Sequence, residues 1–199
     1  MCQLTNLTSH FPSPNPQGNP LYSDEKGKMC YNAAKNWYIG WYNDRRAILY
    51  PNNQPSTWSD TKRMVGVADY KFNGNNFPVT MKLETGGPND YFIGFNRARG
   101  INSDNDEADD EVTIVQTGND GMGYSQSWLK ATLQVGESYT ISNFDGQGKN
   151  INVKLLDIDK STELWTANVL VKDARVAGDG PVVSCQELYA KVISVLLIG

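Results

Sequence analysis

Short stretches of alternating apolar and polar residues follow one another from about residue 63 onward. The period of two recurs over residues 79–84, 91–95, 129–135, 138–142 and 165–172. Successive side chains of a strand point to opposite faces of a sheet, so such a stretch buries one face and leaves the other in water. Each of these stretches is therefore predicted to be a β-strand.

The stretch 151–158 begins with the same alternation but changes phase between Leu155 and Leu156, which predicts a β-bulge. Turn signals rich in glycine and asparagine separate the stretches, and no long helical pattern lies between them. We expect about eight short strands between residues 63 and 174. Such regular spacing is typical of an antiparallel β-sandwich, so the chain is predicted to be mainly β.

Two short helices are expected at the ends of this β-rich region. Residues 32–42 fit a helix that the Asn32 side chain caps and that Gly40 weakens in its last turn. The run Leu188–Ile198 is almost wholly apolar and fits a short C-terminal helix. It is too short to span a bilayer. A truncated or misjoined gene end is the alternative for this run. The proline-rich start of the chain predicts an unstructured lead over residues 1–17.

The charge balance and the histidine count exclude several classes of function. The chain has 199 residues, of which 39% are hydrophobic, and a formal net charge of −4. An acidic chain lacks the basic face that nucleic acids and anionic membranes attract, so neither is expected as a partner. The single histidine, His10, cannot supply the two or three imidazole ligands that a zinc peptidase takes from its protein. We therefore expect no zinc ligand and no catalytic residue in this chain.

The three cysteines are Cys2, Cys30 and Cys185. An odd number leaves at least one of them without an internal partner, and a Cys30–Cys185 disulfide is one pairing that stays open. A free cysteine is often a small buried apolar residue, so none is assigned a catalytic role. Residues 1–20 contain neither the basic region nor the apolar region of a signal peptide.

An acidic cluster over residues 104–111 is the one candidate for a metal. Calcium prefers clustered carboxylate and carbonyl oxygens, which makes Asp104, Asp106, Asp109 and Asp110 its candidate ligands. The cluster is not an EF-hand, because Ala108 and Asp109 occupy the fifth and sixth positions counted from Asp104. A solvated acidic loop is the favoured alternative to a calcium site.

Two further local patterns have simple structural interpretations. The glycine-rich stretch Gly118–Gly123 lacks the lysine ending of a phosphate-binding loop, so a hairpin or loop is expected there. Trp37, Tyr38, Trp41 and Tyr42 form an aromatic cluster. Exposed rings there would stack on sugars, whereas buried rings would join the helix to the sandwich; packing is favoured because large aromatic residues mostly contribute core area.

A tryptophan-rich segment carries a resemblance to a known family. The segments that carry it are Gly18–Asp24, Lys28–Trp37 and Ile39–Tyr42, followed by Gly66–Tyr70 and Asp90–Arg97. Together they resemble the gametolysin-like (gamete lytic enzyme) family of zinc metallopeptidases, in its C-terminal part, over residues 18–175.

In that family an HExxH helix and a third histidine bind zinc, and the glutamate acts as general base on the bound water. The resemblance implies that this chain corresponds to the part beyond the zinc helix, so that no catalytic residue carries over. It implies that Asn19, Pro20, Leu21 and Tyr22 belong to a substrate-cleft wall. It also implies that Cys30 matches a family cysteine.

The resemblance divides the chain into four parts: a lead (1–17), a remnant of the end of the catalytic domain (18–60), a β-sandwich domain (61–175) and a tail with an apolar helix (176–199). If the remnant normally packs under a catalytic domain, an exposed aromatic patch around Trp37 and Trp41 is expected, or self-association that covers it.

Two functions stay open. One is a C-terminal fragment or truncated paralogue of a secreted peptidase that hydrolyses extracellular-matrix protein, itself without the zinc site and inactive. The other is a stand-alone extracellular β-sandwich module that binds glycan or glycoprotein. Both place the chain outside the cell or in the secretory pathway.

Overall fold

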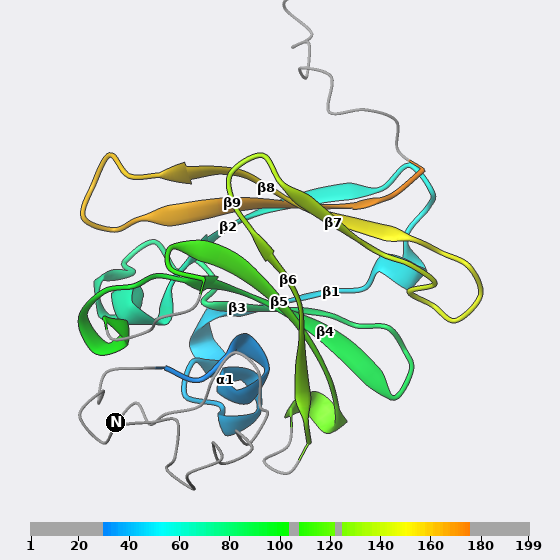
Figure 1. Cartoon of the computed structure of the whole chain (residues 1–199), viewed down its shortest axis with the longest axis horizontal. Coiled ribbons are helices and arrows are strands. Elements are labelled where there is room, and N and C mark those ends of the chain that lie inside the picture. Colours follow the sequence, from blue (N-terminus) through cyan, green and yellow to red (C-terminus); the bar gives the residue numbers. More distant parts are fainter. Residues whose placement is uncertain (1–29, 104–107, 122–124, 176–199) are drawn as a thin grey trace, which may run out of the picture.

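The computed structural model describes residues 30–103, 108–121 and 125–175, which form two stacked β-sheets and one short α-helix (Figure 1). The helix α1 spans Ala33–Ile39. The nine strands of the described residues are β1 (Arg46–Leu49), β2 (Ser59–Val65), β3 (Thr80–Leu83), β4 (Asn89–Asn96), β5 (Glu111–Gly118), β6 (Ser127–Leu133), β7 (Ser138–Ile141), β8 (Ile151–Asp159) and β9 (Thr166–Asp173). The prediction of a mainly β, sandwich-like fold with a short N-terminal helix is confirmed.

The strands form a five-stranded sheet in the order β1-β3-β4-β5-β6 and a four-stranded sheet in the order β2-β9-β8-β7. All neighbouring pairs are antiparallel except β1 and β3, which are parallel. The parallel pair arises because the chain leaves the five-stranded sheet after β1, forms β2 in the other sheet, and returns as β3. The strand pattern predicted an antiparallel sandwich and gave no sign of this parallel pair.

The main core lies between the two sheets, where the alternating positions of both inner faces meet. Met81, Ile93 and Ile114 from one sheet and Leu155 and Val169 from the other are all fully buried. Burial of each such side chain contributes about 1.5–3 kcal/mol relative to its exposure. The period of two in the sequence therefore marks the residues that hold the sandwich together.

The helix α1 covers the outer face of the five-stranded sheet, on the side away from the four-stranded sheet (Figure 1). Ala33, Ala34 and Trp37 of α1 pack there on Phe92 and Val115. Gly94 of β4 permits this approach, because a Cβ atom at that position would lie 3.1 Å from the Cβ of Ala33. The molecule thus has three layers, which are α1, the five-stranded sheet and the four-stranded sheet. Because α1 covers part of it, the outer face of the five-stranded sheet is only partly exposed to solvent.

The helix is shorter than expected but begins as predicted. The Asn32 side chain accepts a hydrogen bond from the backbone N–H of Lys35 at 3.0 Å, which confirms the predicted cap. The helix ends at Ile39 because Gly40 adopts a left-handed conformation with φ of 77°, which ends helices readily.

The predicted bulge in the 151–158 stretch is also confirmed, as the pairing of β8 with β9 shifts between Leu155 and Asp157. A second shift, between Ile114 and Val115 in the pairing of β5 with β6, was not expected from the sequence.

The described part of the predicted remnant, residues 30–60, packs as part of the sandwich. The strand β1 is hydrogen-bonded to β3, and β2 begins at Ser59, so the expected boundary between residues 60 and 61 falls inside a strand. The predicted lead (1–17) and tail (176–199), including the apolar run 188–198, lie outside the described residues. No helix among the described residues has the length and apolar character that crossing a membrane requires.

Candidate ligand-binding pocket

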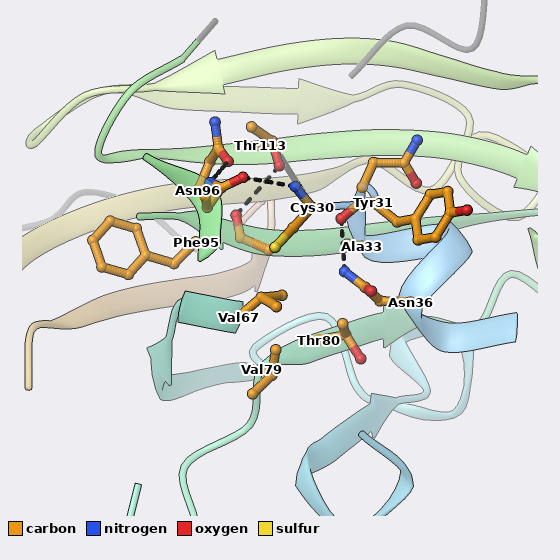
Figure 2. A pocket seen from close by; sticks show the side chains of 13 residues that line it. Cys30, Tyr31, Ala33, Asn36, Val67, Val79, Thr80, Phe95, Asn96 and Thr113 are labelled. Carbon is orange, nitrogen blue, oxygen red and sulfur yellow. Dashed lines mark hydrogen bonds between the residues drawn. The ribbon is translucent and has the colours of Figure 1, made fainter. Parts of the chain in front are cut away.

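A small pocket lies between the start of α1 and the outer face of the five-stranded sheet (Figure 2). Its volume is about 30 Å³, which is room for about two water molecules or the end of one small chemical group. The described residues that line it are Cys30, Tyr31, Asn32, Ala33, Asn36, Val67, Val79, Thr80, Gly94, Phe95, Asn96, Asn102 and Thr113. Amides and hydroxyls dominate its polar part.

Hydrogen bonds hold the segment before α1 against the sheet. The backbone N–H of Cys30 donates to Oδ1 of Asn102 at 2.9 Å, and Nδ2 of Asn102 donates to Oδ1 of Asn96 at 3.0 Å. Nδ2 of Asn36 donates to the carbonyl of Tyr31 at 2.7 Å (Figure 2). The polar rim of the pocket is therefore fixed by the protein itself, without any ligand.

The loop that carries Asn102 is anchored in turn by a buried ion pair. Arg97 donates to Oδ2 of the fully buried Asp69 at 3.2 Å, and its guanidinium lies 3.4 Å from the ring centre of Trp165. Burial raises the pKa of Asp69, and the positive charges of Arg97 and Arg99 oppose that rise. The carbonyl of Arg97 accepts the second N–H of the Asn102 amide at 3.0 Å. The wall behind the pocket is thus rigidly supported.

Asn32 presents an amide donor that lacks a hydrogen-bond partner in the part of the chain that the structure describes. Its Oδ1 is occupied by the helix cap, and this bond fixes which side of the amide is oxygen and which is nitrogen. Nδ2 of this residue, which is only 4% exposed, has no hydrogen-bond partner among the described residues. The group available to a ligand at this point is therefore an N–H donor.

Thr80 presents the second such group. Met81 and Leu83 of β3 face the sandwich core, so the alternation turns Thr80 toward the outer face, where α1 covers it. The residue is 1% exposed, and its Oγ1 has no hydrogen-bond partner among the described residues. Leaving one buried polar group unpaired costs about 1–3 kcal/mol, so a ligand that pairs both groups would recover part of this cost.

The described lining contains no aspartate, glutamate, lysine, arginine or histidine. Its amides and hydroxyls are well suited to hydrogen-bond a neutral polar ligand, which loses less hydration on entering than an ion would.

Aromatic side chains adjoin the pocket on one side. Tyr31 belongs to the lining, and its ring centre lies 6.0 Å from that of Trp41, which is 47% exposed. Trp37, by contrast, is only 8% exposed, because it packs against Phe92 and under the guanidinium of Arg46. The packing interpretation is therefore correct for Trp37 and Tyr42 and wrong for Tyr38 and Trp41, which are exposed. The exposed patch that was expected around both tryptophans is present at Trp41 but not at Trp37.

A separate ionic cluster lies on the same outer face, beyond α1. Nζ of the buried Lys82 contacts Glu84 at 2.7 Å, Asp90 at 2.9 Å and Asp120 at 2.5 Å. Burial alone would lower the pKa of Lys82, but hydrogen bonds to Asp120, Glu84 and Asp90 outweigh it and raise this pKa. The cluster holds the short 3-10 turn Asn119–Gly121 against the sheet. This turn lies within the loop that was expected at residues 118–123.

The candidate calcium ligands are only partly described. Asp104 and Asp106 lie outside the described residues, and Asp109 is exposed. Oδ1 of Asp110 accepts a hydrogen bond from the backbone N–H of Ala98 at 3.1 Å and lies 3.6 Å from Nη1 of Arg97. The described residues contain no group of three metal-ligating side chains. A calcium site stays a prediction: calcium would raise the melting temperature, and an unchanged curve between millimolar calcium and chelator would remove it.

Most other residues singled out from the sequence lie outside the described ranges. They are the cleft-wall residues Asn19, Pro20, Leu21 and Tyr22, the histidine His10, and the cysteines Cys2 and Cys185. Cys30 is described, lines the pocket, and has its Sγ 3.6 Å from the carbonyl of Ile101.

Asn32 and Thr80 were not predicted to form a site. The sequence pattern predicts a helix cap at Asn32 and a solvent-facing strand position at Thr80. The sequence feature that could have indicated this site is the short helix with its apolar residues. Its apolar side has to pack on a face of the sheet, and it then covers the strand positions beneath it.

A scan of protein-family models, a search of curated proteins and a search of solved structures each found no match to this chain. The resemblance to gametolysin-like peptidases therefore rests on the sequence segments alone.

Proposed function

We propose that this chain is a non-catalytic β-sandwich binding module, of the kind that would accompany a gametolysin-like metallopeptidase, and that it binds extracellular glycan or glycoprotein. The observation that carries the proposal is the pocket beside α1, where Nδ2 of Asn32 and Oγ1 of Thr80 are buried without a described partner. Pre-formed, unpaired and uncharged hydrogen-bonding groups favour a neutral polar ligand over an ion.

The position of Trp41 supports a saccharide in particular. Protein sites for polar ligands combine a few fixed hydrogen-bonding groups with aromatic surface. Here an exposed indole lies next to Tyr31, which itself lines the pocket. A sugar offers hydroxyl or amide groups for the pocket and an apolar ring face for the indole, so it matches both features.

The sequence resemblance supports an extracellular setting for this activity. A secreted peptidase that acts on a glycoprotein matrix would gain from a module that holds it on that matrix, because a tethered second site raises its local concentration. In this proposal the sandwich contributes binding and the peptidase chemistry belongs to other parts of such enzymes.

The direct test is a titration of the purified chain with a panel of neutral extracellular oligosaccharides, read by calorimetry. We expect saturable binding of at least one saccharide, and we expect Thr80→Val to weaken it while Thr80→Ser retains it. Thermal unfolding of each variant shows that the fold is kept. Absence of binding to the whole panel at millimolar sugar would overturn the proposal.

A further inference from the structure

We propose that the pocket beside α1 recognises an acetamido group, and hence that its ligand is an N-acetylated sugar. This inference rests on the proposed function, since it names the saccharide class that the same site would take. Its basis is the pairing of one N–H donor, one hydroxyl and an apolar wall within a pocket too small for a whole sugar ring.

The hydrogen-bonding groups fit an amide. Nδ2 of Asn32 can only donate, since Oδ1 of the same side chain is held by the helix cap. The ligand therefore has to supply an acceptor at this point, and an amide carbonyl is one. The hydroxyl of Thr80 both donates and accepts, so it can accept the amide N–H of the same ligand group. A secondary amide carries the two complementary groups, a carbonyl acceptor for Nδ2 and an N–H donor for Oγ1.

The apolar wall fits the methyl group of an acetamide. Val67 and Val79 lie on one side of the pocket, and Ala33 lies at the start of α1 (Figure 2). Val79 and Ala33 are buried in the described structure. A hydroxyl or a water molecule would pair the polar groups but would leave this wall without an apolar partner, whereas a methyl group gains from contact with it.

The size of the pocket places the rest of the ligand outside. A volume of about 30 Å³ admits the end of an acetamido group but not the ring that carries it. The ring would then lie outside the pocket, and Tyr31 of the lining has its ring centre 6.0 Å from that of the exposed Trp41. An indole face offers a large, rigid apolar surface for the C–H groups of a sugar ring.

The test compares two neutral oligosaccharides with the same linkage, N-acetylchitotriose and cellotriose, which differ in the acetamido group at each ring. Calorimetric titration of the full chain is expected to give a dissociation constant at least about tenfold lower for N-acetylchitotriose, because cellotriose leaves both polar groups of the pocket without amide partners. Thr80→Val is expected to remove this preference, and Thr80→Ser is expected to keep it.

Three more variants separate the pocket from the aromatic surface. Asn32→Asp keeps an oxygen for the helix cap but replaces the donor with an acceptor, so it is expected to weaken N-acetylchitotriose selectively. Trp41→Ala is expected to weaken both sugars. Tyr38→Ala is the matched control, since Tyr38, in the last turn of α1, is 48% exposed and does not line the pocket; it is expected to change neither.

Equal binding of the two sugars, unchanged by Thr80→Val and by Asn32→Asp, would overturn the acetamido inference and leave the proposed saccharide function standing. Failure to bind either sugar, with binding to other members of the neutral panel, would overturn the inference in the same way. Failure to bind any saccharide would overturn both.

Discussion

Trp37 and Trp41 lie four residues apart, yet the fold uses them in opposite ways. Trp37 is inside α1 and packs against Phe92 of β4, with ring centres 5.8 Å apart. Trp41 follows Gly40, whose left-handed conformation turns the chain out of the helix, and its ring stays exposed. One indole therefore holds the helix to the sheet, and the other is available to a ligand.

Replacing these two residues should separate stability from binding. We expect Trp37→Ala to lower the free energy of unfolding by about 3 kcal/mol, because it opens a cavity between α1 and the sheet. Trp41→Ala should change it by less than about 0.5 kcal/mol, as is usual for an exposed side chain. Urea unfolding followed by circular dichroism measures both. Equal losses in the two variants would contradict the assignment of Trp37 to the core.

Asp173 gives the protein a predictable response to acid. Its carboxylate accepts hydrogen bonds from Nε and Nη2 of Arg175 at 2.9 and 2.8 Å, and it also accepts from the backbone N–H of Arg175. The Arg175 side chain is the main reason that the pKa of Asp173 falls to about 2 from its ordinary value of 3.8, and burial opposes the fall. A carboxyl with a lowered pKa stabilises the folded state above its ordinary pKa and loses that contribution as the pH falls toward its lowered pKa.

We therefore expect the unfolding free energy to decline between pH 3.8 and about 2, in part because of Asp173. Asp173→Asn should flatten this decline, and Arg175→Gln should flatten it as well. Urea titrations at a series of pH values provide the measurement. If the unfolding free energy of both variants declines with pH as steeply as that of the unaltered protein, the ion pair does not contribute to the acid response.

The contact between α1 and the turn Asn119–Gly121 decides how closely the helix approaches the sheet. Nζ of Lys35 donates to the carbonyls of Gly121 and Ser125 at 3.1 and 2.6 Å, and Lys82 holds Asp120 from the other side. Asn119 and Asp120 both have positive φ, at 51° and 53°. Two lysines thus hold a strained turn against the helix, which keeps α1 over the buried part of β3.

Gly121 is the tightest point of this contact. Its φ is 79°, and a Cβ atom there would collide with the backbone carbonyl of Ala34. We expect Gly121→Ala to cost about 3 kcal/mol, from backbone strain and overpacking together. Gly136→Ala is the matched control, because Gly136 also has positive φ but faces open space; its cost should be about 1 kcal/mol. A similar loss of unfolding free energy in the two variants would show that α1 shifts to make room for the added Cβ at residue 121.

The elements could be predicted from the sequence wherever one face of a strand is buried and the other is wet. That condition holds for β8, whose bulge was also visible as a change of phase at Leu155. It does not hold for β5, where four consecutive residues, Val112 to Val115, are buried and no strand was predicted. It fails again for β1, a four-residue edge strand whose parallel pairing depends on a crossover through the other sheet. Short local patterns do not encode such long-range pairing.

At the scale of the whole molecule, the pocket exists because α1 packs on the outer face of the five-stranded sheet. Asn32 comes from the start of α1, Thr80 from β3, and the amides of Asn96 and Asn102 from the end of β4 and the loop that follows it. The sequence predicts the cap at Asn32 and the strand at Thr80, but it does not show that the helix folds back over that strand. The candidate site therefore required the structure, whereas the expectation of a chain without a zinc site required only the histidine count.

The relation to a peptidase is also a property of the whole chain. With one histidine in its sequence, the purified protein should release no peptide from casein or gelatin in the presence of zinc. A fluorescent casein assay with and without a chelator checks this expectation. Turnover that the chelator abolishes would contradict the proposed non-catalytic role.

The central claim is that a neutral saccharide binds in the pocket beside α1. The most direct measurement is a titration of the ¹⁵N-labelled protein with N-acetylchitotriose, followed by two-dimensional NMR. We predict that the largest shifts fall on the side-chain amide of Asn32 and on the backbone amides of Thr80 and Gly94, while strands β7 to β9 stay unchanged. Shifts confined to the four-stranded sheet, or none at saturating sugar, would contradict the account.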